Sequence, residues 1–132
     1  MRNGWAMIVT MALAGGPALA GDAAAGKETY LRYCATCHGT EGRGDGPTAA
    51  ILTLQPIDLT QLAARAGGVL PIGRIVARID GREPMVAHGS PMPVWGEFFD
   101  GQYAAIKTAT GQPILTSQPI VDLVAYIDSI QN

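Results

Sequence analysis

The stretch Tyr33–Pro47 reads "YCATCHGTEGRGDGP" and holds the only two cysteines of the 132-residue chain. Cys34 and Cys37 are three positions apart, and His38 directly follows the second cysteine. Thiols at this spacing on one helical turn can both reach the vinyl groups on neighbouring pyrroles of a haem. His38, which follows Cys37, then projects toward the centre of the haem ring. C-x-x-C-H is the attachment motif of c-type haem, so we expect two thioethers from Cys34 and Cys37 and an iron ligand from His38.

Two other uses of the same residues fit less well. A thioredoxin-like redox pair is expected at the start of a helix in a βαβ unit. Here the pair falls near the end of a predicted helix, with no strand pattern before it. A structural zinc site needs four ligands, and beyond Cys34, Cys37 and His38 the chain offers only the distant His88. The motif therefore favours haem attachment.

Residues 1–20, "MRNGWAMIVTMALAGGPALA", have the pattern of a secretory signal peptide. Arg2 is the positive end, residues 5–14 are apolar, and residues 18–20 form an A-x-A cleavage site. We expect export to the periplasm and a mature domain at residues 21–132. An uncleaved membrane anchor is the alternative, although the apolar run is shorter than the ~20 residues of a comfortable span.

The overall charge excludes some partners. The chain has a formal net charge of −2 and becomes more acidic if Arg2 is removed with the signal peptide. It has no basic field to hold nucleic acid or an anionic membrane. We therefore expect no nucleic-acid partner, and membrane contact only if residues 1–20 remain attached.

The rest of the chain predicts a single all-α domain with long, glycine-rich loops. No strand pattern is evident, and residues 97–113 are interpreted as a short helix followed by a loop. Ser117 is the expected cap of the last helix. The expected helical segments are residues 22–38 with Asp22 as cap and Gly39 as stop, 48–54, 59–66, 71–79 and 117–131.

With these features the chain resembles the class I cytochromes c, which carry one haem. Gly26 and Tyr30 fall where that family has a glycine and an aromatic residue on the first helix, and Leu123 and Tyr126 fall where the last helix crosses it. A glycine inside a helix costs about 1 kcal/mol against alanine, so we expect Gly26 to allow close approach of another backbone. The resemblance implies the cytochrome c fold, with helices and loops wrapped around one covalent haem c.

The resemblance also implies residues around the haem. Pro47 in "GDGP" matches the proline whose carbonyl accepts the Nδ1–H of the haem histidine, a bond that fixes the ring. "PMPVWG" matches the loop with the sixth ligand, here Met92. Met85 and His88 are alternatives to Met92. Trp95 is expected to pack beside the haem, where its indole N–H could bond a propionate.

Three arginines recur at helical spacing, at Arg74, Arg78 and Arg82. Two interpretations stay open: a solvated helix face, or a contact with the propionates or with an acidic partner.

The function implied is electron transfer by a haem iron that cycles between Fe(III) and Fe(II), with no enzymatic activity. The expected partners are redox proteins or a respiratory complex. Residues 97–116 are longer than a small carrier needs, which keeps open a fixed haem subunit of a dehydrogenase or oxidase. A haem peroxidase or ligand sensor would need an open sixth position, which bound Met92 would deny.

Overall fold

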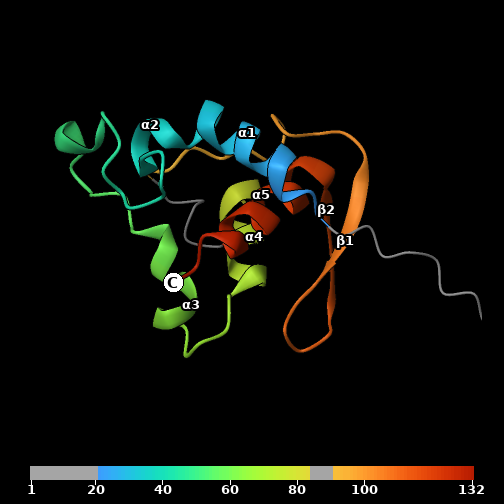
Figure 1. Ribbon diagram of the computed structural model, residues 1–132. Coiled ribbons are helices and arrows are strands. Elements are labelled where there is room, and N and C mark those ends of the chain that lie inside the picture. The colour runs from blue at the N-terminus through green and yellow to red at the C-terminus, as the bar shows by residue number, and fades with distance from the viewer. Residues whose placement is uncertain (1–20, 84–90) are drawn as a thin grey trace, which may run out of the picture.

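The computed structural model describes residues 21–83 and 91–132. Figure 1 shows α1, α4 and α5 gathered together, with a β-hairpin along one side and long loops between the helices. No helix within the described ranges is long and apolar enough to cross a membrane. The elements are α1 (Ala23–Tyr33), α2 (Ala35–His38), η1 (Ala49–Ile51), η2 (Leu59–Gln61), α3 (Leu62–Arg65), α4 (Ile72–Asp80), β1 (Tyr103–Lys107), β2 (Pro113–Ser117) and α5 (Gln118–Ser129), where η marks 3-10 helix.

Helix α1 begins where the sequence predicts. The Asp22 side-chain Oδ1 accepts hydrogen bonds from the backbone N–H groups of Ala24 at 2.9 Å and Ala25 at 3.2 Å. These N–H groups have no partner inside the helix, so the carboxylate satisfies donors that would otherwise need water. The prediction that Asp22 caps this helix is confirmed.

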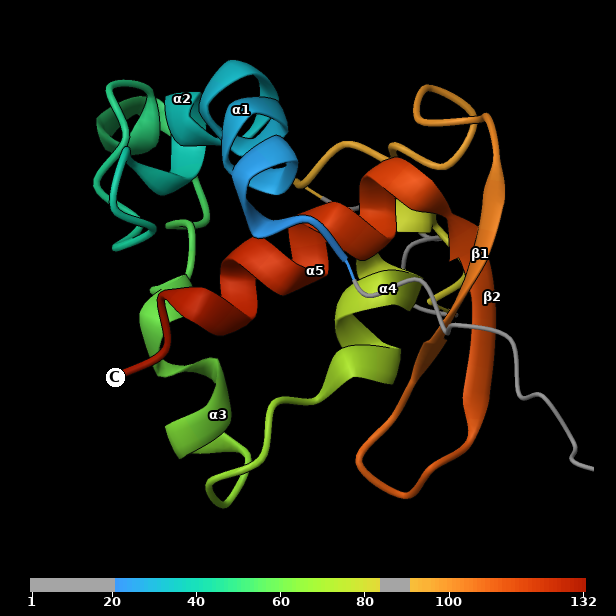
Figure 2. The same cartoon turned by 45° about the vertical axis from the view of Figure 1, so that its right-hand side comes forward.

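Helix α1 lies across α5, as both views show (Figures 1 and 2). A Cβ atom placed on Gly26 would overlap the backbone carbonyl of Asp122 in α5. Beside this contact Tyr30 is fully buried, and its ring centroid lies 5.0 Å from that of Tyr126. Leu123 is buried in the same cluster. The expectation that Gly26 allows a second backbone to approach is confirmed.

Helix α4 is amphipathic and confirms the predicted helix over residues 71–79. Ile75, Val76 and Ile79 are buried and join the cluster formed by α1 and α5. The helix ends at Gly81, whose φ of 85° is in the left-handed region that favours glycine. The turns expected at residues 48–54 and 59–66 are also confirmed, as η1, η2 and α3.

Strands β1 and β2 form an antiparallel hairpin, so the expectation of no strands, with only a helix and a loop in this region, was wrong. Tyr103 pairs with Ser117, and Ala105 pairs with Leu115. Ala104 and Thr116 are buried on the inner face, while Tyr103, Ala105 and Leu115 are exposed. Because alanine occupies both an inner and an outer position of β1, the sequence shows no alternation of polar and apolar residues. The fold remains mostly helical.

The start of α5 differs from the sequence prediction in one detail. Ser117 occupies the cap position, but its side chain makes no capping hydrogen bond. Its Oγ is buried and has no hydrogen-bond partner among the described residues. Asp122 is the polar group that ties this end of α5 to its surroundings: its Oδ1 accepts from the side-chain amide of Gln118 at 2.7 Å and from the backbone N–H of Asp22 at 2.8 Å.

The crossing of α1 and α5 predicts the effect of a glycine substitution. Gly26→Ala should lower the free energy of unfolding by about 2 kcal/mol or more, because the new methyl group meets a backbone carbonyl and neither helix can yield locally. Urea unfolding of the holoprotein followed by circular dichroism measures this loss.

The matched control is Gly101→Ala, where a Cβ atom meets nothing within 4 Å. We expect Gly101→Ala to change the free energy of unfolding by less than about 0.5 kcal/mol. Equal unfolding curves for the two variants would contradict the proposed role of the contact.

Candidate haem-binding site

One cavity of about 500 Å³ opens among α1, α2, α4 and the loop after residue 90. Cys34, Cys37 and His38 line it, together with Met92 and Trp95. These residues are up to 61 positions apart in the chain, so the fold gathers five of the six predicted site residues at one place. Pro47 is exposed and does not line the cavity. Met85 and His88, the alternative sixth ligands, lie outside the described residues.

The attachment motif lies on a helical turn. The backbone N–H of Cys34 donates to the carbonyl of Tyr30 at 2.8 Å, and that of His38 donates to the carbonyl of Cys34 at 2.9 Å. Gly39, with a φ of 81°, ends the turn as predicted. Thiols and imidazole are therefore held on a short rigid segment at one wall of the cavity.

Both thiols are half-buried and unbridged. Burial raises the pKa of Cys34 to about 11, and the nearby Cys37 adds to the shift. Because of this raised pKa, the Cys34 thiol is protonated at neutral pH and is not a strong nucleophile by itself. The other thiol has a polar neighbour: the Thr48 Oγ1 atom lies 3.3 Å from the Cys37 Sγ and 2.8 Å from the carbonyl oxygen of Thr36.

His38 is oriented by a carbonyl group, but not by the one that the sequence suggested. Its Nδ1 lies 3.3 Å from the backbone oxygen of Ile57. Because a carbonyl only accepts, this contact places the proton on Nδ1 and leaves the lone pair on Nε2 for a metal. Burial lowers the pKa of His38, although the bond to Ile57 opposes the shift. The lowered pKa favours the neutral imidazole, which is the form that ligates a metal.

The displacement of Pro47 from this role has a local cause. The loop after Gly39 folds back on α2, where the N–H of Gly46 donates to the carbonyl of Cys37 at 3.1 Å. A Cβ atom on Gly46 would meet the backbone of Thr36 and Cys37. Pro47 follows this contact and is exposed, and the backbone oxygen beside the His38 imidazole comes from Ile57.

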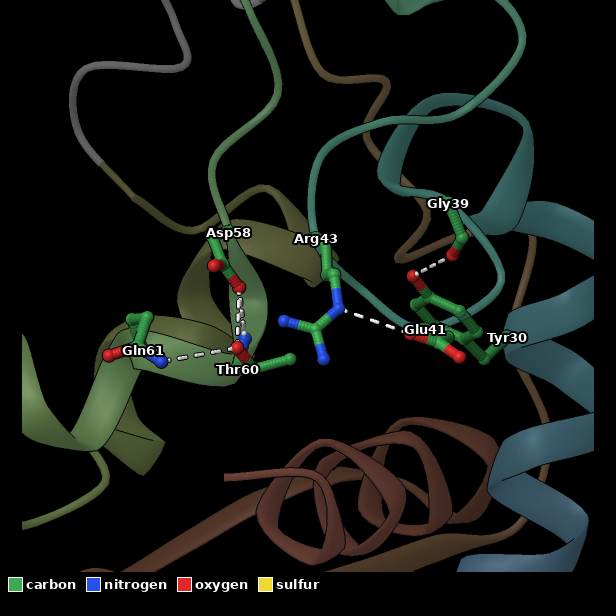
Figure 3. A network of polar contacts seen from close by, with 7 residues as sticks. All are labelled: Tyr30, Gly39, Glu41, Arg43, Asp58, Thr60 and Gln61. Carbon is green, nitrogen blue, oxygen red and sulfur yellow. Dashed lines mark hydrogen bonds and ion pairs between the residues drawn. The ribbon is translucent and has the colours of Figure 1, made fainter. Parts of the chain in front are cut away.

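Two further side chains fix the segments on either side of His38, and Figure 3 shows both. The Tyr30 hydroxyl donates to the carbonyl of Gly39 at 2.6 Å, and burial raises its pKa. Asp58 accepts from the N–H of Thr60 at 2.9 Å and from its hydroxyl at 2.7 Å. Sequence reasoning missed Asp58 and Ile57, although Asp two residues before Thr at a helix start is a recognisable capping pattern.

Trp95 belongs to a cluster of aromatic side chains. Its ring centroid lies 5.8 Å from that of Tyr33, 5.4 Å from that of Phe98 and 5.5 Å from that of Phe99. Tyr33 directly precedes Cys34, so the cluster joins the attachment turn to the loop that carries Met92. Met92 itself is half-buried and packs against the core.

The charged groups at the cavity are mostly cationic. Arg65, Arg74 and Arg78 line it, and Glu83 is the only lining carboxylate within the described residues. Glu83 accepts from Arg78 at 2.9 Å and from Arg74 at 3.4 Å. Arg82 pairs with Asp80 instead and does not line the cavity. Of the three arginines at helical spacing, Arg74 and Arg78 are therefore the two that line the cavity.

The residues present fit a haem. The two thiols and the neutral imidazole share one wall, most of the lining is apolar, and the excess of arginine over glutamate complements the two propionates. Leu123 and Ile127 of α5 close the cavity on the side of the core. The donor set is that of a covalently attached haem with one histidine ligand and a methionine within the same cavity.

Comparison with known proteins agrees with this fold and site. The Cytochrome c family matches residues 23–131, and the chain belongs to this family. Among individual proteins, cytochrome c-554(547) of Halothiobacillus neapolitanus is 48% identical over 50 residues, which cover 36% of this chain and 55% of that protein. The chain thus matches about half the length of this curated relative. No solved structure matches significantly. As a cytochrome c, the chain has covalently bound haem c as its cofactor.

The attachment motif predicts the effect of removing thiols. Cys34→Ala should keep covalent haem through Cys37 alone, and its pyridine haemochrome band should move to longer wavelength because one vinyl group stays conjugated to the ring. The double variant Cys34→Ala, Cys37→Ala should lose haem staining after denaturing electrophoresis.

Thr36→Ala is the control, because Thr36 lies between the cysteines and its side chain is exposed. It should keep the wild-type haemochrome spectrum. Haem that still migrates with the denatured double variant would show that the attachment residues are wrongly assigned.

Proposed function

We propose that this protein is a periplasmic electron carrier that exchanges single electrons with redox partner proteins and has no enzymatic activity. The observation that carries the proposal is the meeting of Cys34, Cys37, His38 and Met92 at one mostly apolar cavity. When bound, haem c supplies an iron that cycles between Fe(III) and Fe(II). His38 and Met92 are the proposed axial ligands.

The side chains of this cavity suit electron transfer without proton chemistry. The contact with Ile57 orients His38, so the ligand does not have to rotate during a redox cycle. Most of the cavity lining around His38 is apolar. The lining carboxylate, Glu83, is engaged by two arginines, Arg74 and Arg78. A methionine ligand favours the reduced state more than a second histidine would.

Partner docking requires an accessible edge of the cavity. Leu54 and Ile57 line the cavity and are exposed, with 61% and 50% of their surfaces open to solvent. An exposed apolar rim of this kind suits brief contacts with a small buried area, which redox partners use. The location rests on the signal-peptide pattern of residues 1–20; these residues lie outside the described ranges.

A fixed haem subunit of a larger dehydrogenase or oxidase is the second candidate. The outer face of the hairpin favours it, because Tyr103 and Leu115 are 65% and 61% exposed on neighbouring strands. Size-exclusion chromatography of native extract separates the two candidates: a carrier elutes as a small protein, and a subunit elutes with its complex.

Met92 predicts a spectroscopic result. Met92→Ala should abolish the weak near-infrared absorption band of sulfur–iron ligation and lower the reduction potential, because a thioether ligand is lost. Met85→Ala and His88→Ala should keep the band and the potential of the wild type. A band that survives in Met92→Ala but disappears in Met85→Ala would transfer the assignment to Met85.

Carbon monoxide binding tests the proposal against haem catalysis or ligand sensing. The reduced wild-type protein should bind carbon monoxide slowly and weakly, because Met92 occupies the sixth position, whereas Met92→Ala should bind it rapidly. Stopped-flow absorbance measures both rates. Rapid binding by the wild type would favour a peroxidase or sensor with an open site.

A further inference from the structure

The loop that carries Met92 is anchored at Trp95, three residues further along the chain. The backbone N–H of Trp95 donates to the carbonyl of Ile79 in α4 at 2.8 Å. Its ring lies against Tyr33 of α1, next to the attachment turn. Three residues of chain span at most about 11 Å, so the place where Trp95 is held limits where the Met92 sulfur can be.

Two glycines allow this loop to lie directly on the end of α4. A Cβ atom on Gly96 would overlap the backbone carbonyl of Asp80. A side chain on Gly81 would collide with Val94, and its φ of 85° also disfavours other residues. Residues 94–96 therefore pack on the backbone of residues 79–82, which we call the α4 turn.

The α4 turn is itself tied to the hairpin. The Arg82 guanidinium donates through Nε to the Asp80 carboxylate at 2.6 Å and through Nη2 to the carbonyl of Leu115 in β2 at 3.1 Å. The backbone N–H of Arg82 also donates to Asp80, at 3.1 Å. Strand β2 lies beside α4 (Figure 2). The hairpin thus braces the α4 turn through Arg82 and Leu115, neither of which lines the haem cavity.

We propose that the α4 turn, braced by the hairpin through Arg82, is a clamp that holds residues 94–96 and thereby sets the strength of the Met92–iron bond. The inference rests on the proposed function, in which Met92 is an axial ligand. Gly96, Asp80 and Arg82 are positioning residues, because they act through the loop and not on the iron. The long segment between the methionine loop and the last helix, residues 97–117, thereby has a role, because it contains the hairpin that braces the α4 turn.

Imidazole binding to the ferric protein measures the strength of that bond, because imidazole must displace Met92 to reach the iron. Gly96→Ala should push the loop off the α4 turn, bind imidazole at least tenfold more tightly than the wild type, and weaken the near-infrared band. Gly101→Ala is the matched control in the same connection, where a Cβ atom meets nothing within 4 Å. It should match the wild type in both measurements.

Arg82→Gln tests the brace without adding atoms to the loop. It should tighten imidazole binding three- to tenfold, and the double variant Asp80→Asn, Arg82→Gln should tighten it no further, because both changes remove the same contact. Arg43→Gln is the control, since Arg43 forms a comparable exposed ion pair with Glu41 at 3.1 Å and does not line the cavity. It should leave the affinity unchanged.

The outcomes separate this inference from the function on which it rests. A wild-type protein without the near-infrared band, or one that binds imidazole as tightly as Met92→Ala, would overturn Met92 ligation itself. The clamp is wrong if the wild type and Met92→Ala behave as expected but Gly96→Ala and Arg82→Gln bind imidazole no more tightly than their control variants. Variants that lose thermal stability but keep wild-type imidazole affinity would also refute it. If Gly96→Ala yields no holoprotein, Arg82→Gln decides.

Discussion

The contact between Gly26 of α1 and the carbonyl of Asp122 in α5 fixes how the two main helices cross. Both helices contribute to the haem cavity. Helix α1 leads directly into the attachment turn, and α5 places Leu123 and Ile127 in the cavity wall. If the helices separated by the width of a methyl group, these two walls would move apart, because protein interiors are packed without spare volume. The geometry of the site therefore depends on a position that has no side chain.

Helix α4 contributes to the cavity through three of its parts. Its buried face packs into the core through Ile75, Val76 and Ile79. Its other face places Arg74 and Arg78 at the cavity, where they share Glu83. The helix end then contacts the loop that carries Met92. Helix α4 thus joins the core, the arginines at the cavity and the methionine loop. A displacement of α4 would therefore change the geometry of all three.

From the cavity we also expect the haem to contribute to the stability of the fold. Apolar side chains line a space of about 500 Å³, and unfilled space of this kind forfeits dispersion contacts along its walls. A ligand that binds the folded chain more tightly than the unfolded one stabilises the fold, and covalent attachment keeps that ligand in place. The cofactor of this cytochrome c is therefore part of its core as well as its redox centre.

Much of the site could be predicted from the sequence because its chemistry lies in neighbouring residues. Cys34, Cys37 and His38 are placed together by one turn of helix, whatever the rest of the chain does. Helix ends were similarly readable at Asp22 and Gly39. The reason for Gly26 could be anticipated because glycine is costly inside a helix.

Tertiary structure decided what local pattern could not express. Every residue has a carbonyl group, so only the path of the loop determined that Ile57, and not Pro47, orients His38. The hairpin remained hidden because Ala104 and Ala105 have the same side chain on opposite faces. The Ser117 hydroxyl could have capped α5, but packing buried it without a partner among the described residues. Sequence alone therefore determined the cofactor and its attachment turn, because these depend on neighbouring residues. The partner of His38 and the bracing of the methionine loop were decided by contacts between distant segments.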